Sequence, residues 1–131
     1  MESKGEGAAN IRFDDREGFL YAYVSGERDS LAISIEYFHR VVEEAYKRES
    51  KRLLIEENFP NQLSLTEIYT LTVEISKMLK TPLKIAFVDR MAEQNQLNMF
   101  GETVAVNRGV YGRVFSDIRE AEKWLKAESI G

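Results

Sequence analysis

The chain has 131 residues, of which 22 are acidic and 18 are basic, giving a formal net charge of −4. This length suits one domain, and the interspersed charges lack the concentrated positive field that binds nucleic acid, so we expect no nucleic-acid partner. The absence of cysteine excludes thiol chemistry and cysteine-ligated metals. It is also compatible with a reducing cytoplasm, where we expect the protein to reside.

The first nine residues are rich in glycine and charge, which predicts a disordered tail over residues 1–9 followed by one domain over residues 10–131. This opening is too polar for a signal peptide. No apolar run approaches the roughly 20 residues of a membrane span, so we predict no integral membrane segment.

Two strands are predicted first, IRFDD and then FLYAYV over residues 19–24, joined by a glycine-bearing turn as in a β-hairpin. From Ser30 onward, apolar residues recur at steps of four and three, which predicts a helix ending near Arg48. Its expected buried stripe is Leu31, Ile35, Phe38, Val42 and Ala45. The compact apolar run over residues 53–55 then predicts a strand covered on both faces.

The clearest helix signal covers residues 63–79. Ser64-x-x-Glu67 is a capping box, and Leu63 with Ile68 forms the flanking hydrophobic staple. The expected buried face is Leu65, Ile68, Thr72, Ile75 and Leu79. A strand over residues 83–89 follows, with apolar residues on both of its faces.

The remaining elements are a helix within residues 93–109, a weaker strand over 110–115 and a last helix over 116–127. The first of these helices closes on Gly109, a residue suited to a left-handed turn. In the last helix, Ile118, Ala121 and Leu125 should face inward. Strands that alternate with helices in this way predict a single-domain α/β fold. We expect a mixed, mostly parallel sheet of about five strands, with an N-terminal hairpin and four main helices.

Few residues offer catalytic or metal chemistry. With one histidine and no cysteine, the chain has neither a Cys-His pair nor two histidines for a metal. We therefore predict no catalytic residue, no metal and no cofactor. Polar residues do gather at the carboxyl ends of the strands, where open α/β sheets bind ligands. They are Asp29, Ser30, Asn58, Asn61, Ser64, Asp89, Arg90, Ser116 and Asp117. Helix capping also explains serine and aspartate at such positions.

Two further residues suggest an interaction surface. Ile33 and Tyr37 lie about opposite the expected buried stripe of the first long helix. An exposed apolar pair of this kind marks a candidate interface.

The C-terminal third resembles a known family. A strand ending in Phe115, then Ser116-Asp117, Ala121 and Trp124-Leu125, together with the order of elements, resembles the STAS domain and its SpoIIAA-like branch. The resemblance covers roughly residues 10–127. It implies a non-enzymatic regulator that binds partner proteins and is phosphorylated on a serine of an Asp-Ser-Ser-Gly motif. Here Leu63, Ser64, Leu65 and Thr66 occupy that place, so the serine is retained whereas the aspartate and glycine are absent.

Three functions remain open at this point. The first is a regulatory or protein-binding module that docks a partner or a second copy through Asp29, Ser30, Asn58, Asn61, Asp89 and Arg90, with Ser64 as a candidate regulatory phosphosite. The second is a small-molecule or lipid carrier, because the SpoIIAA-like branch resembles SEC14-type lipid-exchange proteins. Its pocket would open between the sheet and a mobile NFPNQL loop. The third is an enzyme using Asp89 and Arg90, which rests on strand-end position alone.

Overall fold

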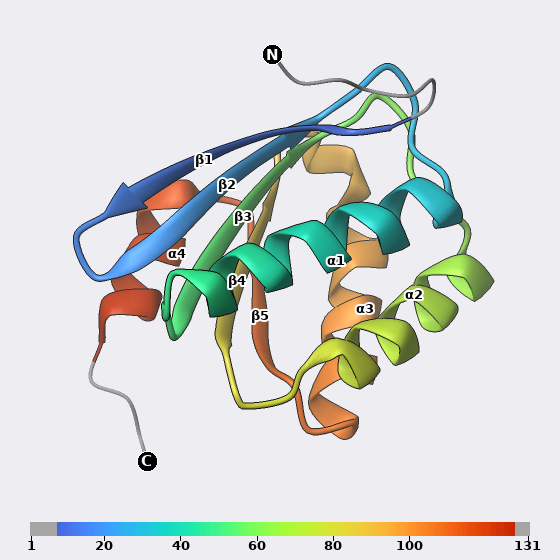
Figure 1. Ribbon diagram of the computed structural model, residues 1–131. Helices are drawn as coiled ribbons and strands as arrows, with labels where there is room; N and C mark the ends of the chain where they lie inside the picture. Colours follow the sequence, from blue (N-terminus) through green and yellow to red (C-terminus); the bar gives the residue numbers. More distant parts are fainter. Residues whose placement is uncertain (1–7, 128–131) are drawn as a thin grey trace.

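Five strands form one sheet in the order β1-β2-β3-β4-β5, with helices packed on both faces (Figure 1). The computed structural model describes residues 8–127. β1 is antiparallel to β2, and the other neighbouring strands are parallel. The predicted α/β fold is confirmed within this range. Its elements are β1 (Asn10–Arg16), β2 (Phe19–Ser25), α1 (Leu31–Lys47), β3 (Arg52–Asn58), α2 (Leu65–Met78), β4 (Lys84–Asp89), η1 (Ala92–Gln94), α3 (Asn95–Asn107), β5 (Tyr111–Phe115) and α4 (Ile118–Lys126).

The N-terminal hairpin forms the antiparallel edge of the sheet. Arg16 pairs with Phe19 across the turn, and Gly18 adopts φ of +90°, a conformation that favours glycine. Residues 1–7 of the predicted tail lie outside the described residues. Ala9, which we also assigned to the tail, is buried in the core, and its carbonyl oxygen accepts a hydrogen bond from Arg40 Nη1 at 3.2 Å. The packed structure therefore begins at least one residue earlier than predicted.

Helices α1, α2 and α3 cover one face of the sheet, and α4 covers the other (Figure 1). Helices α1, α2 and α3 join β2 to β3, β3 to β4 and β4 to β5, so the chain moves across the sheet in one direction. Because each of these crossovers is right-handed, the three helices lie on the same face. Within β3, Leu53 and Ile55 point to the α1–α3 face, whereas Leu54 packs against α4. The strand is thus covered on both faces, as its apolar run predicted. None of the helices within residues 8–127 is long and apolar enough to cross a membrane.

The buried face of α1 is displaced from the predicted stripe, because Leu31 and Ile35 are only half-buried. Tyr37 is fully buried and Ile33 is partly buried against the core, so the expectation of an exposed Ile33–Tyr37 pair is wrong. The reason is that α1 packs on both the sheet and α2, so that two adjacent rows of its side chains are covered. The buried residues of α1 are Ser34, Tyr37, Phe38, Val41, Val42 and Ala45.

Helices α2 and α3 approach each other closely at Gly101. A Cβ atom there would lie 3.2 Å from Ile68 Cγ2, so the missing side chain allows the contact. Leu65, predicted on the buried face of α2, is instead 52% exposed. Gly109 adopts φ of +83° after α3, as predicted.

Helix α4 closes the opposite face as expected. Asp117 caps its N-terminus by accepting a hydrogen bond from the Arg119 amide at 3.2 Å. Ala121 and Leu125 are fully buried against β3 and β4.

Candidate functional site

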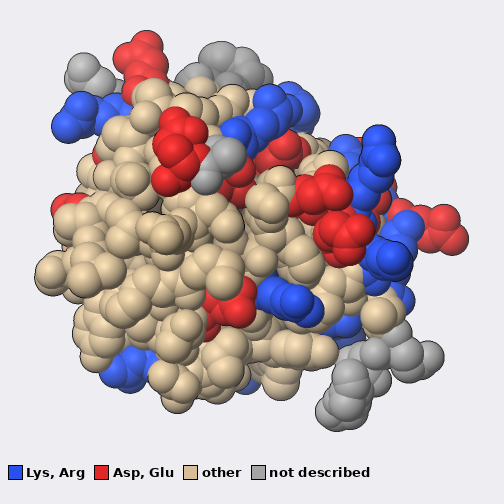
Figure 2. Space-filling view, turned by 180° about the vertical axis from the view of Figure 1, so that it is seen from behind, with Lys and Arg blue, Asp and Glu red and all other residues tan. Residues whose placement is uncertain are grey.

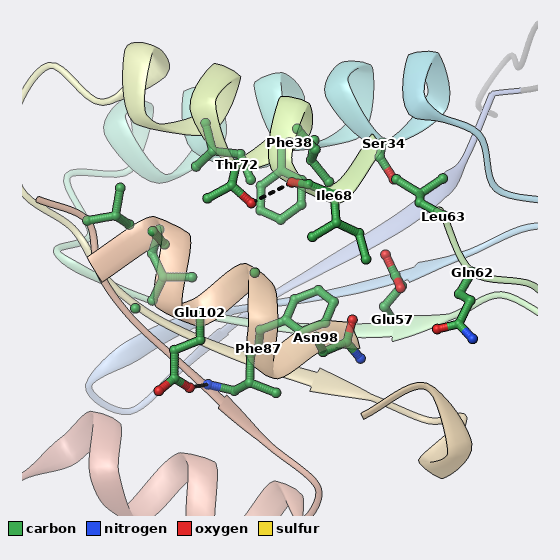
Figure 3. A pocket seen from close by; sticks show the side chains of 18 of the residues that line it. Ser34, Phe38, Glu57, Gln62, Leu63, Ile68, Thr72, Phe87, Asn98 and Glu102 are labelled. Carbon is green, nitrogen blue, oxygen red and sulfur yellow. Dashed lines mark hydrogen bonds between the residues drawn. The ribbon is translucent and has the colours of Figure 1, made fainter. Parts of the chain in front are cut away.

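A cavity of about 120 Å³ lies between the sheet and helices α1–α3 (Figure 3). Its walls are mostly apolar, and its polar residues concentrate toward the carboxyl ends of β2 and β3 and the start of α3. The apolar lining is Tyr37, Phe38, Leu63, Ile68, Leu71, Ile75, Ile85, Phe87, Ala105, Val110 and Val114. An apolar pocket with a few polar groups at one end is typical of small-molecule binding sites.

Glu57 is the central polar residue of this site. It is the last inward-facing residue of β3, it is only 7% exposed, and its Oε2 accepts a hydrogen bond from the Tyr37 hydroxyl. In Figure 3 the carboxyl group points into the space between Leu63 and Asn98. Burial, with the nearby negative charges of Asp29 and Asp89, raises the pKa of Glu57 to about 8.

Asp29 is the second acidic residue that lines the cavity. It is 6% exposed, and its carboxylate accepts hydrogen bonds from the Ser34 hydroxyl at 2.8 and 2.9 Å and from the Ser30 amide at 2.8 Å. Burial raises its pKa to about 6, although the hydrogen bonds from Ser34 and Ser30 oppose that shift. This carboxylate is held in place by neutral donors.

Asp89 stands directly beside Glu57, because the two residues are register partners on neighbouring strands. It is 6% exposed, and it accepts hydrogen bonds from Asn98 Nδ2 and from the Met91 amide, both at 2.9 Å. Burial raises its pKa, and the negative charge of Glu93 adds to the shift. We call Asp29, Glu57 and Asp89 the acidic end of the site.

Gln94 completes the acidic end from η1. It is 4% exposed and lines the cavity, yet its side chain makes no hydrogen bond with any described residue. No fully enclosed side-chain nitrogen or oxygen lacks a partner in the described part of the chain, so the Gln94 amide is not fully enclosed by protein.

The NFPNQL loop is anchored to the rest of the fold, contrary to the expectation that it is mobile. Phe59 is fully buried, 6.3 Å from the Tyr37 ring between centroids. A Cβ atom on Gly26 would lie 2.7 Å from the Phe59 ring, so the β2–α1 connection packs directly against it. Asn61 binds the backbone of Asp29 twice, at 2.8 and 3.0 Å. The loop thus forms a fixed wall of the site.

Ser64 begins α2 as a helix cap. Its hydroxyl accepts a hydrogen bond from the Glu67 amide at 3.2 Å, and the Glu67 carboxylate accepts one from the Ser64 amide at 3.0 Å. Both halves of the predicted capping box are therefore present. Ser64 is exposed, so a kinase could reach it, but it does not line the cavity.

A different polar cluster lies on the α4 face of the sheet. Glu56 accepts hydrogen bonds from the Tyr21 hydroxyl and from Arg90 Nε, the latter at 2.7 Å. Burial, together with Glu56, raises the pKa of Tyr21 to about 12. Asn58 donates to the Tyr23 hydroxyl at 2.9 Å, and the Arg90 guanidinium lies over the Tyr23 ring.

The structure therefore divides the predicted site residues between two faces. Asp29, Ser30, Asn61 and Asp89 lie at the acidic end, whereas Asn58 and Arg90 belong to the α4 face. Asp89 and Arg90 point to opposite faces, so they do not form a joint catalytic pair. Ser116 and Asp117 lie at the start of α4, away from the cavity lining.

Sequence reasoning missed Glu57 and Gln94, and it assigned Tyr37 to an exposed interface and not to this site. Glu57 had a usable signal, because it continues the alternation of Leu53 and Ile55 and must point to the same face. The sequence contains no comparable signal for Gln94, since this residue lies in a short irregular segment.

The site's chemistry is that of polar recognition. Its carboxyl, hydroxyl and amide groups can donate or accept hydrogen bonds and hold a charge of opposite sign. No group of three or more His, Asp or Glu side chains within residues 8–127 is arranged to hold a metal ion.

Comparison with known proteins adds no assignment. No family model matches this sequence, and no curated protein is significantly similar to it. The STAS likeness therefore stays a prediction.

We predict that the protein loses stability as the pH rises from 5 to 8. An acid whose pKa is raised by folding binds more protons in the folded state, so stability falls between the unfolded and folded pKa values. That window runs from 4.5 to about 8 for Glu57 and from 3.8 to about 6 for Asp29. Urea unfolding across this range should show a slope of up to about 1.4 kcal/mol per pH unit for each group.

The Glu57→Gln variant should flatten the part of this slope above pH 6, because Asp29 has largely lost its proton there. The matched control is Glu56→Gln, which removes the neighbouring carboxylate on the opposite face and should retain the slope. An unchanged slope in Glu57→Gln would show that another group causes the pH dependence.

We also predict that Ser64→Ala lowers the free energy of unfolding by about 1 kcal/mol, because it removes the capping hydroxyl. Ser64→Asp should retain most of the stability, since aspartate also caps helices. Thr66→Ala, at an exposed position of the same turn, is the control. Equal unfolding midpoints for Ser64→Ala and wild type would argue against the capping role.

Proposed function

We propose that the chain is a non-enzymatic binding protein that holds a small, largely apolar molecule between its sheet and helices α1–α3. The observation that carries this proposal is the cavity of about 120 Å³, apolar along most of its lining and polar at the strand ends. The likeness to the SpoIIAA-like branch, which itself resembles lipid-exchange proteins, supports the same function.

The size of the cavity sets the size of the ligand. An apolar protein cavity of about 150 Å³ binds benzene, so a space of this order accommodates a molecule of single-ring size. Phe38, Ile68 and Phe87 offer such a ring apolar contact from α1, α2 and β4 (Figure 3). A longer ligand would have to extend past the cavity.

The distribution of reactive residues favours binding over catalysis. The chain has no cysteine, and its one histidine, His39, is exposed on α1 and does not line the cavity. The polar side chains at the acidic end hold one another by hydrogen bonds, which suits recognition of a polar group.

The test is to fill the cavity. Ala105 lines it from α3, so Ala105→Leu should occupy part of the space. Toluene should raise the melting temperature of wild type, because a ligand that binds the folded state stabilises it, and should have little effect on Ala105→Leu. The control is Ala32→Leu, an exposed position on α1, which should respond as wild type does. If toluene and other single-ring probes leave wild type unchanged, the proposed function is wrong.

A second candidate function is protein docking, and a specific observation favours it. Leu65 and Tyr69 on α2, with Met99 and Val106 on α3, are 44 to 55% exposed. Within α3, Glu102 is the one charged residue. Figure 2 shows a broad area almost free of charge on its left side, where α3 lies when Figure 1 is turned round. Exposed apolar surface of this kind marks interaction sites.

The likeness to STAS regulators supports this second function. Ser64 precedes Leu65 directly, so phosphorylation would place a charge of about −2 beside this apolar surface and weaken apolar contacts there. Such a position suits a regulatory site.

Sedimentation velocity tests the docking surface in its simplest form, self-association. Met99→Glu should convert a concentration-dependent dimer into a monomer, because it places a charge in the apolar contact. Ala32→Glu, on the exposed side of α1, should leave the dimer intact. A wild-type chain that remains monomeric at its highest soluble concentration would exclude self-association through this surface.

A further inference from the structure

The carboxyl groups of the acidic end have no positively charged partner among the described residues. Asp29, Glu57 and Asp89 are all buried, and none of them forms an ion pair with a described residue. The charged groups that act on Glu57 and Asp89 are themselves acidic. Buried carboxylates in proteins are normally paired with cations, so this arrangement needs an explanation.

Glu56, the residue next to Glu57, shows the usual arrangement. It faces α4, and Arg90 Nε binds its Oε2 at 2.7 Å. Glu57 points to the other face of the same strand and has a neutral partner, Tyr37. The two neighbouring carboxyl groups thus differ in whether the protein itself supplies a cation.

The one basic residue that lines the cavity does not reach the acidic end. Arg113 belongs to β5, two strands from β3, and its register lies three residues behind that of Glu57. These offsets correspond to roughly 10 Å across the sheet and roughly 10 Å along it. The Arg113 guanidinium instead lies 5.3 Å from the centre of the Phe115 ring.

Two polar groups at the acidic end are left open toward the cavity. Glu57 Oε1 has no hydrogen-bond partner among the described residues, since Tyr37 binds the other oxygen. The Gln94 side chain, 4% exposed, has none either. Neither is fully enclosed by protein, and both residues line the cavity. A carboxylate and an amide oxygen are acceptors, which suits a ligand that donates hydrogen bonds.

An anionic ligand is disfavoured here, even though the N-termini of α1 and α2 lie at this end of the site. Helix N-termini attract anions through free amide groups and the helix dipole. At α1, however, the Ser30 and Ile33 amides already donate to Asp29 and Ser30 side chains. At α2, the Glu67 amide donates to Ser64. Side chains of the protein therefore already accept hydrogen bonds from three of the amides that an anion would use.

We propose that the ligand is an organic amine whose ammonium group binds between Glu57, Asp29 and Gln94, with its apolar body against Phe38, Ile68 and Phe87. This inference rests on the proposed binding function and specifies its ligand class. The ammonium supplies the missing positive charge and donates to the open acceptors, and it makes charge-assisted hydrogen bonds that a neutral ligand lacks. A cavity of about 120 Å³ takes the single ring, and a short chain would carry the amine beyond it to the acidic end.

Binding of such a cation should release protons. Burial raises the pKa of Glu57 to about 8, and the groups that face it are Tyr37 on α1, Asp29 before α1 and Asp89 on β4. Glu67 and Glu93 act in turn on the two aspartates. A nearby ammonium favours the ionised carboxylate, so up to one proton should leave Glu57 at pH 7.

The experiment is calorimetric titration of the full chain with three probes that share a phenyl ring and differ in charge: phenethylamine, phenethyl alcohol and phenylacetate. The amine should bind about tenfold more tightly than the alcohol, because hydrogen bonds to charged groups contribute on that order. Its affinity should rise from pH 6 to pH 8, and its heat should depend on the ionisation enthalpy of the buffer as protons are released.

Two variants test whether Glu57 is the residue that binds the ammonium group and releases the proton. Glu57→Gln should reduce the amine affinity to that of the alcohol and abolish proton release. Glu56→Gln, which leaves the cavity lining intact, should bind as wild type does. If Glu57→Gln does not fold, the proposal is still tested on wild type. The tests are the relative affinities of the three probes and the dependence of the amine's binding heat on the buffer.

The outcomes separate this inference from the function on which it rests. Equal affinities for amine and alcohol, or tightest binding of phenylacetate, would overturn the amine proposal and leave the binding function standing. If neither these three probes nor toluene bind, both proposals are wrong. Preferential amine binding without proton release would exclude Glu57 as the residue that receives the cation.

Discussion

The buried carboxyl group of Glu57 is the constraint on which much of this structure depends. A charged group at the end of the central strand would be costly in an apolar core without partners. The Tyr37 hydroxyl provides one, which requires α1 to lie with Tyr37 turned toward β3. Phe59 then packs near the Tyr37 ring and fixes the loop that leads to α2. The position of α1, the anchoring of the loop and the polar end of the cavity thus follow from one buried group.

The topology explains why these groups meet. In a sheet with strand order β1 to β5, the parallel strands β2, β3 and β4 all end at the same edge. Asp29, Glu57 and Asp89 follow or close these three strands, although 60 residues separate the first from the last. Their repulsion is a consequence of that convergence. It is tolerated because Ser34, Asn98 and backbone amides hydrogen-bond to the two aspartates.

The general fold could be predicted from sequence because its signals are local. The compact apolar run of β3, the Ser64–Glu67 capping box and the glycine after α3 each depend on a few neighbouring residues. The orientation of α1 could not be predicted in the same way. Its apolar periodicity indicated one stripe, but Tyr37 is buried because its hydroxyl has a partner 20 residues away. The prediction that Leu65 is buried was wrong for a similar reason, since exposure in the first turn of α2 depends on what packs there and not on the local apolar pattern.

The candidate site was predicted in position but not in composition. Strand-end reasoning selected Asp29, Asn61 and Asp89, which the structure brings together at the acidic end, and it also selected Arg90, which turns to the α4 face. Successive residues of a strand point to opposite faces of the sheet. A shift of one residue in the predicted end of a strand therefore places a side chain on the wrong face. Glu56 and Glu57 show the consequence. One carboxyl group is neutralised within the protein by Arg90, whereas the other is left facing a cavity without a cation. That difference between adjacent residues, invisible in composition or net charge, makes one face of the sheet a structural layer and gives the other the features of a binding site.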